Sequence, residues 1–367
     1  MLRLTLVFVI LTVAAFACAS TAAQSSDAPQ VENARLEKKA LAGSLVAAVK
    51  AWAANDEQPR WLGYAVPQMG RDRAMCCGDY DGGWRNGCGH CRLEDHGNGT
   101  NMTSKDEGGS AKLEGPRSIA VLFRAENKRI MKIRVVSMDC ALDAGGLSLV
   151  WLTGVKPAES IELLETFVKG SDLEAHDDDH ASHGALTAIA LHADPAADRA
   201  LESFTRTDQP ESLRKQTAFW LGAARERAGL IALEKMAKSD PSSEVRAHVT
   251  FALSVSHEQG AIEDMIRMAH DDQSSHVRGQ ALFWLAQKAG QKAVAAITGA
   301  IENDPDTDVK KKAVFALSQL PKDEGVPKLI EVAQTNRNRE VRKQAMFWLG
   351  QSHDPRALAF FEKILSQ

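Results

Sequence analysis

The sequence predicts a mainly α fold, a right-handed α-solenoid of stacked helical hairpins preceded by a small disulfide-containing α/β module. A nine-residue motif recurs every 32 residues through the second half of the chain, and each copy is apolar on one helical face. The first half instead holds all six cysteines and two runs of alternating residues that are typical of strands. We therefore predict a module at residues 24–155 and an array at residues 156–367.

The repeated motif defines the array. In one copy Val277, Ala281 and Leu285 fall on a single helical face, as an amphipathic helix requires. A second apolar helix precedes each copy, and a degenerate sixth copy occupies residues 181–189. One hairpin cannot bury both of its apolar faces, but stacked hairpins share a core, so about six repeats are expected. The five regular copies begin at Leu213, Val245, Val277, Val309 and Val341.

A ladder of polar residues follows the same period. Asp or Asn in each turn can accept a backbone N–H at the start of the next helix, and a basic residue follows six positions later. We favour capping and ion pairing between repeats over a charged binding strip as its role. Its members are Asp208 and Arg214, Asp240 and Arg246, Asp272 and Arg278, Asp304 and Lys310, and Asn336 and Arg342.

Tryptophan alternates with alanine along the array. Trp220, Trp284 and Trp348 occupy every second copy of the motif, with Ala252 and Ala316 between them. Alternating large and small residues let adjacent layers interdigitate. Because these positions lie on the apolar helix face, core packing is favoured over a row of exposed rings that stacks on a ligand.

This pattern closely resembles the HEAT repeat, in the short bacterial form related to phycobilin-lyase-like repeats. The resemblance rests on the Asp-to-Arg spacing and on the Phe-Trp-Leu or Phe-Ala-Leu helix, and it covers about residues 156–367. It implies a solenoid that binds a protein or peptide partner, with a lyase-like HEAT enzyme as an alternative. A di-iron site like that of the deoxyhypusine hydroxylase family is not expected, because the His257-Glu258 pair has no counterpart in the next repeats.

The amino terminus has the layout of a secretory signal peptide, residues 1–23. Arg3 precedes an apolar run from Leu4 to Ala17, and small residues follow up to Ala23. The run is shorter than the roughly 20 residues that span a bilayer, so no membrane span is predicted. The mature chain is expected to be periplasmic or secreted. A lipoprotein anchored through Cys18 is less favoured, because the residues before it lack the usual Leu.

The net charge and the expected compartment limit the classes of partner that the chain can bind. The net charge is −4 at pH 7 and the basic residues are scattered, which argues against nucleic acid. We expect a monomer without a cofactor. Export would place the thiols in an oxidising compartment, where disulfides form.

The module is predicted to contain a helix over residues 31–53, loops up to residue 115, and a strand hairpin from residues 118–124 and 132–137. Its Cys88-Gly-His-Cys91 motif is consistent with structural disulfides, a zinc site or a redox dithiol. A redox role needs a helix N-terminus that lowers the thiol pKa. The motif has Gly-rich flanks instead, so structural disulfides are favoured.

The first half also resembles the N-terminal part of a family of exported bacterial HEAT-repeat proteins. The matching segments are Trp61–Pro67, Cys76-Cys77, Cys91–Glu94 and Asp139–Gly146. Cys88 looks like an addition to that pattern, so the resemblance marks it as the free or redox thiol. It implies two bridges among Cys76, Cys77, Cys91 and Cys140, and it brings no known activity.

A loop rich in histidine and aspartate is the remaining candidate site. His176, Asp178, His180 and His183 have side chains that bind divalent metals, although a solvated loop is favoured. No catalytic residue is assigned. The expected function is a non-catalytic scaffold in the cell envelope. The alternative is a redox or metal-dependent envelope protein that uses Cys88 and Cys91.

Overall fold

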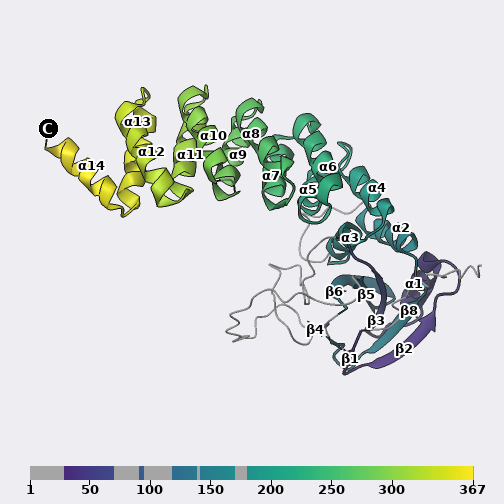
Figure 1. Cartoon of the computed structure of the whole chain (residues 1–367). Coiled ribbons are helices and arrows are strands. Elements are labelled where there is room, and N and C mark those ends of the chain that lie inside the picture. Colours follow the sequence, from purple (N-terminus) through teal and green to yellow (C-terminus); the bar gives the residue numbers. More distant parts are fainter. Residues whose placement is uncertain are drawn as a thin grey trace, which may run out of the picture.

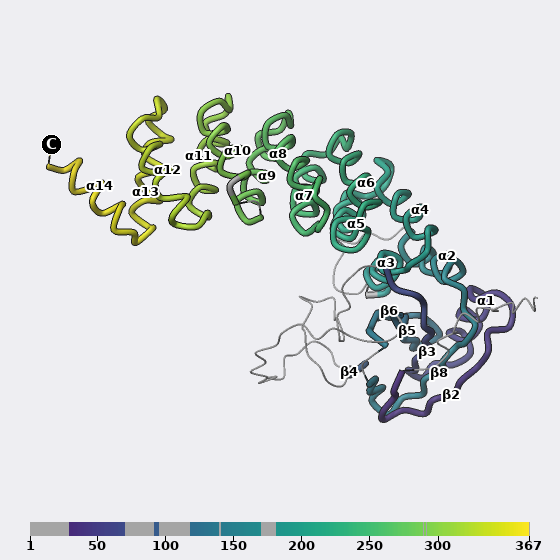
Figure 2. Tube along the Cα trace, viewed as in Figure 1, coloured from purple at the N-terminus to yellow at the C-terminus, as the bar shows by residue number. Residues whose placement is uncertain are grey.

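The computed structural model describes residues 29–69, 91–94, 118–138, 141–169, 180–288 and 290–366. A β-sheet with its covering helices forms one end of the molecule, and stacked hairpins extend from it in an arc (Figure 1, Figure 2). The expected helical array is present, together with part of the expected α/β module. No helix among these residues combines the length and apolar character needed to cross a membrane.

The module is built on a mixed five-stranded sheet beside a small three-stranded one. β2 and β8 pair in parallel, while β5 pairs antiparallel with both β3 and β6. The larger sheet has the order β2 (Arg35–Ala40), β8 (Ser148–Thr153), β3 (Arg60–Pro67), β5 (Ser118–Glu126), β6 (Arg129–Ser137). The smaller sheet has the order β1 (Val31–Glu32), β7 (Leu142–Asp143), β4 (Cys91–Arg92).

The start of the module is extended where the sequence predicted a helix. β1 and β2 replace the first part of the helix expected over residues 31–53, and only α1 (Leu45–Ala54) is helical. All 6 residues of β2 are exposed. Pairing with β8 therefore decides their conformation, and their charged side chains suit a sheet edge. The apolar spacing behind the prediction belongs to α1, which buries Leu45 and Val49.

β3 is a central strand in a stretch that the sequence predicted to be loop. It pairs with β8 on one side and β5 on the other, and most of its side chains are buried. At Gly63 a Cβ atom would lie 2.5 Å from the Leu122 side chain and 2.9 Å from the Trp151 ring. The glycine thus serves close packing rather than a turn. The predicted hairpin is confirmed as β5 and β6.

Two hydrophobic cores lie on opposite faces of the large sheet, because alternate strand residues point to opposite sides. On one face, Trp61 and Trp151 pack with Leu93 of the short segment beside β4. On the other face, the side chains of β3 and β5 join those of the helices in one core that continues along the array to Phe360. The predicted boundary at residues 155/156 lies between β8 and α2, and the core is continuous across it.

Six hairpins and one further helix make up the described array. The helices that precede the motif each carry an apolar residue at the same place in the 32-residue period. These residues, Leu201, Leu233, Met265, Ile297 and Leu329, are buried, whereas Phe361 is partly exposed. The hairpins are α2 (Pro157–Val168) with α3 (His180–Leu191), α4 (Pro195–Phe204) with α5 (Glu211–Ala224), α6 (Glu226–Ser239) with α7 (Ser243–Val255), α8 (Gly260–Asp271) with α9 (Ser275–Lys288), α10 (Gly290–Asn303) with α11 (Thr307–Gln319), and α12 (Lys322–Thr335) with α13 (Arg339–Gln351), and they are followed by α14 (Pro355–Leu365).

The second helices form a row that begins against the sheet. α3 packs on β6, α5 packs on α3, and α7, α9, α11 and α13 follow in turn. We call the exposed side of α5, α7, α9, α11 and α13 the inner face, and α4, α6, α8, α10, α12 and α14 the outer helices. Figure 1 shows α5, α7 and α9 on the side of the array that faces the sheet.

The contact between α3 and β6 depends on a glycine. A Cβ atom on Gly184 would lie 1.9 Å from the carbonyl oxygen of Ile133 in β6. The same position in the next repeat is Gln216, on the inner face. The sheet thus covers, in the first repeat, the surface that later repeats expose.

A buried arginine strengthens this junction. Arg225 is 1% exposed and donates hydrogen bonds to the carbonyl oxygens of Ala190 (3.2 Å) and His192 (2.6 Å). It also pairs with Asp198 of α4 at 2.7 Å. The guanidinium therefore ties the end of α3 to the next hairpin.

Candidate binding surface

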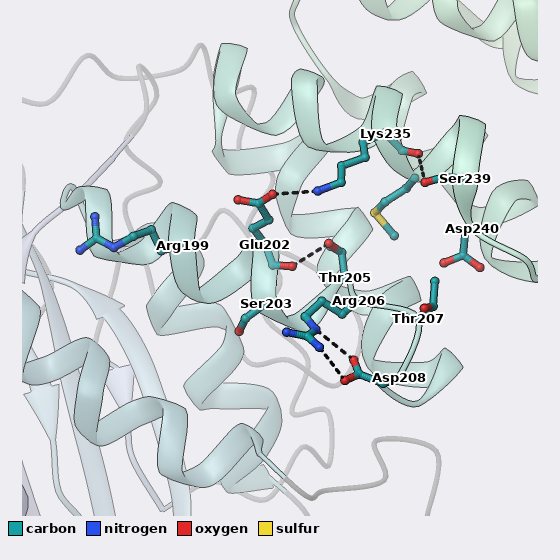
Figure 3. A pocket seen from close by; sticks show the side chains of 11 residues that line it. Arg199, Glu202, Ser203, Thr205, Arg206, Thr207, Asp208, Lys235, Ser239 and Asp240 are labelled. Carbon is teal, nitrogen blue, oxygen red and sulfur yellow. Dashed lines mark hydrogen bonds and ion pairs between the residues drawn. The ribbon is translucent and has the colours of Figure 1, made fainter.

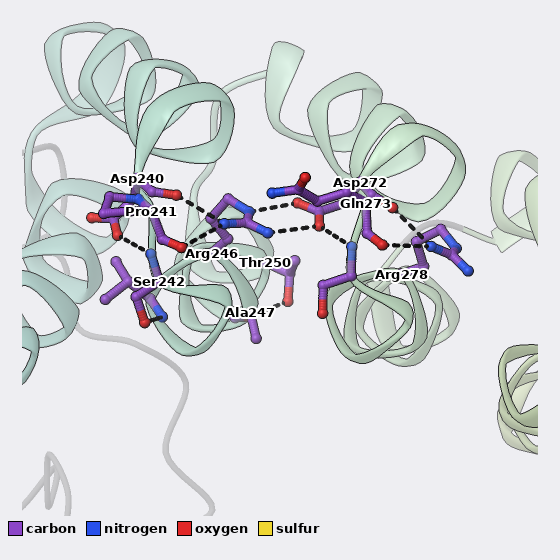
Figure 4. Close-up of polar contacts among 11 residues, drawn as sticks. Asp240, Pro241, Ser242, Arg246, Ala247, Thr250, Asp272, Gln273 and Arg278 are labelled. Atoms are coloured by element: carbon purple, nitrogen blue, oxygen red, sulfur yellow. Dashed lines mark hydrogen bonds and ion pairs between the residues drawn. The ribbon is translucent and has the colours of Figure 1, made fainter.

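The polar ladder links successive repeats through buried ion pairs (Figure 4). Arg246 donates from Nε and Nη2 to both carboxylate oxygens of Asp272 at 2.8 and 3.0 Å. Asp272 in turn accepts the backbone N–H of Ser274 at 2.8 Å. The same arrangement joins Arg214 to Asp240 and Arg278 to Asp304. Each arginine therefore binds the aspartate of the repeat that follows it.

The two ends of the ladder differ from its middle. Asp208 is exposed and pairs with Arg206 at 3.0 Å, while Lys310 donates to the carbonyl oxygen of Glu302 at 2.9 Å. Asn336 accepts the backbone N–H of Asn338 at 2.9 Å, and Arg342 donates to the carbonyl oxygen of Asn336 at 2.7 Å.

The three arginine–aspartate pairs are buried, so their charged groups are scarcely accessible to a ligand. The side chains of Arg214 and Asp240 are 5% and 2% exposed, and those of Arg246 and Asp272 are 6% and 5% exposed. Charges buried and paired to this degree hold neighbouring elements together. In these repeats the geometry matches capping and pairing, and it offers no charged strip.

A row of phenylalanines runs along the inner face. One phenylalanine from each of the five second helices from α5 to α13 contributes, and the first four are partly exposed while Phe347 is 54% exposed. Two neighbouring pairs of rings are stacked, with interplanar angles of 15° and 5°. The row consists of Phe219, Phe251, Phe283, Phe315 and Phe347.

The alternating tryptophans join the stacked pairs into one aromatic surface. Trp284 contacts Phe251 with ring centroids 4.8 Å apart, and Trp348 contacts Phe315 at 5.0 Å. Trp220 is buried at 3% exposure, whereas Trp284 and Trp348 are partly buried and pack against the core. The core packing expected from the sequence thus holds fully for Trp220 and partly for the other two.

Polar side chains flank the aromatic row. Three positions before each phenylalanine lie Gln216, His248, Gln280, Lys312 and Gln344. The His248 ring meets Phe251 edge-on at 5.5 Å. Burial, aided by the charge of Lys215, lowers the pKa of His248. The inner face therefore combines apolar rings with hydrogen-bonding side chains, of which Lys312 carries a charge, and this composition suits a protein or peptide surface.

A groove also lies between two of the outer helices. A groove of about 630 Å³ is formed by α4, the turn after it and α6 (Figure 3). Within it Lys235 pairs with Glu202 at 3.0 Å, and Arg206 pairs with Asp208 at 3.0 Å. Asp240, at its edge, is already bound to the arginine of the preceding repeat. The charges of this groove are thus largely neutralised within the fold.

A buried polar chain connects the sheet to the first hairpin. The Tyr64 hydroxyl lies 2.7 Å from Ser160 Oγ, which lies 2.9 Å from His192 Nε2. His192 Nδ1 donates to the carbonyl oxygen of Ala188 at 2.5 Å, so Nε2 is the acceptor for Ser160. A serine beside a histidine is a nucleophile pattern, but Tyr64, Ser160 and His192 are each 0% exposed. A substrate cannot reach them, and their role is structural.

This chain makes stability depend on pH. Burial is the main cause that lowers the pKa of His192 to about 4. An unfolded chain binds the proton near pH 6.5, so the contribution of neutral His192 is fully present above pH 6.5 and is lost as pH falls to about 4. The loss is about 3 kcal/mol. We expect denaturant titrations at pH 7 and pH 4.5 to show a smaller drop for His192→Gln than for the wild type. An equal drop would contradict this assignment.

A comparison with protein-family models assigns the repeats of the array to a family. The model for HEAT repeats matches residues 198–286, 262–345 and 294–367. The C-terminal part of this chain is an array of HEAT repeats. The HEAT assignment agrees with the resemblance seen in the sequence, and the matched residues begin within α4. No curated protein matches the sequence.

The chain is only distantly similar to several solved structures. Human deoxyhypusine hydroxylase in complex with glycerol is 15% identical, with a TM-score of 0.27 over 56% of this chain and 90% of that one. The CpcE and CpcF complex of phycocyanin lyase from Nostoc sp. PCC7120 is 19% identical, with a TM-score of 0.32 over 56% of this chain and 80% of that one. Kap95p bound to RanGDP is 18% identical, with a TM-score of 0.39 over 59% of this chain and 33% of that one.

Most of the predicted cysteine and histidine sites lie outside the described residues. These include Cys76, Cys77, Cys88, Cys140, His176 and Asp178. Cys91 is placed on β4 and His180 at the start of α3. His183 Nε2 lies 3.1 Å from the side-chain nitrogen of Gln216. Among the described residues, no group of three His, Cys, Asp or Glu could hold a metal ion.

Proposed function

We propose that this protein is an exported, non-catalytic scaffold that binds a protein or peptide partner along the inner face of its HEAT array. The observation that carries the proposal is the continuous, partly exposed aromatic row from Phe219 to Phe347. Exposed apolar surface of this kind marks interaction sites in soluble proteins. Aromatic residues are also the ones that dominate binding energy at protein interfaces.

The shape of the row favours an elongated partner. Each repeat offers one phenylalanine and one polar side chain at a fixed period, so a chain lying across several helices meets the same pair of groups repeatedly. Side-chain amides such as those of Gln280 and Gln344 both donate and accept hydrogen bonds, and they suit peptide groups. Location in the cell envelope rests on the signal-like amino terminus and belongs to this proposal.

Site-specific photo-crosslinking in the native cell envelope tests the proposal. A photoreactive amino acid at position 280, on the inner face, is expected to capture a discrete polypeptide. The matched control is position 295, where the exposed Ala295 lies on the outer helix α10. Equal labelling from both positions, or no polypeptide captured from position 280, would contradict the assignment of the inner face.

A further inference from the structure

Lys312 is the one charged member of the row of polar side chains that flanks the phenylalanines. Gln216, Gln280 and Gln344 are neutral, and the lowered pKa of His248 leaves its ring neutral at pH 7. Lys312 lies on α11, well inside the array, and it is exposed. The inner face therefore carries a cation at a place where the other repeats carry an uncharged hydrogen-bonding group.

The Lys312 side chain lies back along the preceding second helix. In the first repeats, Gln216 of α5 takes the same direction, and its side-chain nitrogen lies 3.1 Å from His183 of α3. Lys312 lies over Gly279 of α9, where an added Cβ atom would lie 3.1 Å from the lysine Nζ and 3.3 Å from its Cε. The lysine thus lies against α9 instead of extending into solvent.

Gly279 is the one residue at its place in these second helices that has no side chain. Glycine is unfavourable inside a helix, so its presence in α9 has a packing reason, which is room for the stem of Lys312. Two departures from the repeat pattern, the glycine and the lysine, therefore lie in direct contact. The residues at the same place in the neighbouring repeats are His183, Lys215, Ala247 and Lys311.

The ammonium group of Lys312 has no anionic partner within the described part of the chain. Asp308 lies one turn earlier on α11, but Lys311 binds it at 2.6 Å. Glu340 at the start of α13 is bound by Lys343 at 3.1 Å. The carboxylates at the starts of both helices are therefore already paired with other lysines.

A stacked pair of rings lies beside this ammonium group. Phe283 follows Gly279 by four residues and Phe315 follows Lys312 by three, so each ring shares a helix face with the residue named before it. The two rings are stacked at an interplanar angle of 5°, with centroids 6.1 Å apart. A polypeptide that covers the rings removes water from around the ammonium group, which strengthens its attraction for an opposite charge.

We infer that the polypeptide bound by the inner face carries an aspartate or glutamate between apolar side chains. Lys312 binds the carboxylate, and the rings of Phe283 and Phe315 bind the apolar neighbours. This inference rests on the proposed function, because it concerns the same face. Charge complementarity supports it: covering an unpaired ammonium group costs free energy unless the partner supplies an opposite charge. Lys312 thereby also disfavours partners with a neutral or basic residue at this place.

Selection from random peptides displayed on phage, with the full chain immobilised, tests the inference. It is run in parallel on the wild type, on Lys312→Gln and on Lys328→Gln. Glutamine is the residue that three other repeats carry at the place of Lys312, so the fold tolerates it. Lys328 lies on the outer helix α12 and pairs with Glu331 at 2.9 Å, so Lys328→Gln removes the same charge away from the inner face.

The wild type and Lys328→Gln are expected to select peptides with an acidic residue between apolar ones, and Lys312→Gln is expected to lose this preference. A synthetic copy of such a peptide, with the acidic residue replaced by its amide, is expected to bind the wild type about fivefold more weakly in fluorescence anisotropy. The same replacement is expected to leave binding to Lys312→Gln unchanged.

A photoreactive amino acid at position 280 shows whether the selected peptides lie on the inner face. Peptides that crosslink there but show no acidic preference, or keep it on Lys312→Gln, would overturn the inference and leave the proposed function standing. Selected peptides that do not crosslink from position 280, or no enrichment of any peptide on the wild type, would contradict both.

Discussion

Arg246→Ala is expected to lower the free energy of unfolding by about 3–5 kcal/mol, because it leaves a buried carboxylate without its partner. The side chains of Arg246 and Asp272 are 6% and 5% exposed and share two hydrogen bonds. The variant also leaves the carbonyl oxygen of Asp240 without the donor at 2.8 Å. Urea denaturation of the full chain measures the change.

Arg206→Ala is the matched control for that variant. Arg206 also pairs with an aspartate, Asp208, but their side chains are 68% and 59% exposed. Exposed pairs of this kind contribute about 0–1 kcal/mol. Equal effects of the two variants would show that the ladder is not what joins the repeats.

Gly184→Ala is expected to destabilise the junction between sheet and array by about 3 kcal/mol. The added methyl group would lie 1.9 Å from the carbonyl oxygen of Ile133, a backbone atom that cannot rotate away. α3 must then shift from β6, and with it Arg225 and the buried His192. Thermal unfolding followed by circular dichroism measures this loss of stability.

The control for this substitution is Gly299→Ala. Gly299 lies within α10, and nothing lies within 4 Å of the Cβ position. Alanine there is expected to stabilise the protein by about 0.5–1 kcal/mol. A Gly184→Ala variant that matched this gain would contradict the close approach of α3 and β6.

The array could be predicted from the sequence because its physics is local and repeated. Each copy carries its own amphipathic pattern, and the polar ladder recurs at the same spacing. The helix predicted from one copy is therefore supported by the same pattern in the five others. The β-module lacked such redundancy. β2 is a charged, exposed strand that only β8 holds in place, and β3 contains Gly63, whose packing role depends on Trp151 far along the chain.

The phenylalanine row has a signal in the sequence, but its exposure becomes evident only in the structure. Trp284 lies seven positions after Val277, on the apolar face, whereas Phe283 lies about 120° from Val277 around the helix. An apolar residue that lies outside the buried face and returns in five successive repeats is the signal that indicates a surface here. The cysteine pairings and the His-rich loop stay predictions, because most of their residues lie outside the described part of the chain.

Binding of a polypeptide by the inner face is best tested by the native mass of the full chain purified from the cells that produce it. Phe347→Glu and Ile231→Glu form a matched pair, because Phe347 is 54% exposed on the inner face and Ile231 is 55% exposed on the outer helix α6. We expect a complex with a polypeptide for the wild type and for Ile231→Glu, and the bare chain for Phe347→Glu. A bare wild-type chain, or a complex that survives in Phe347→Glu, would contradict it.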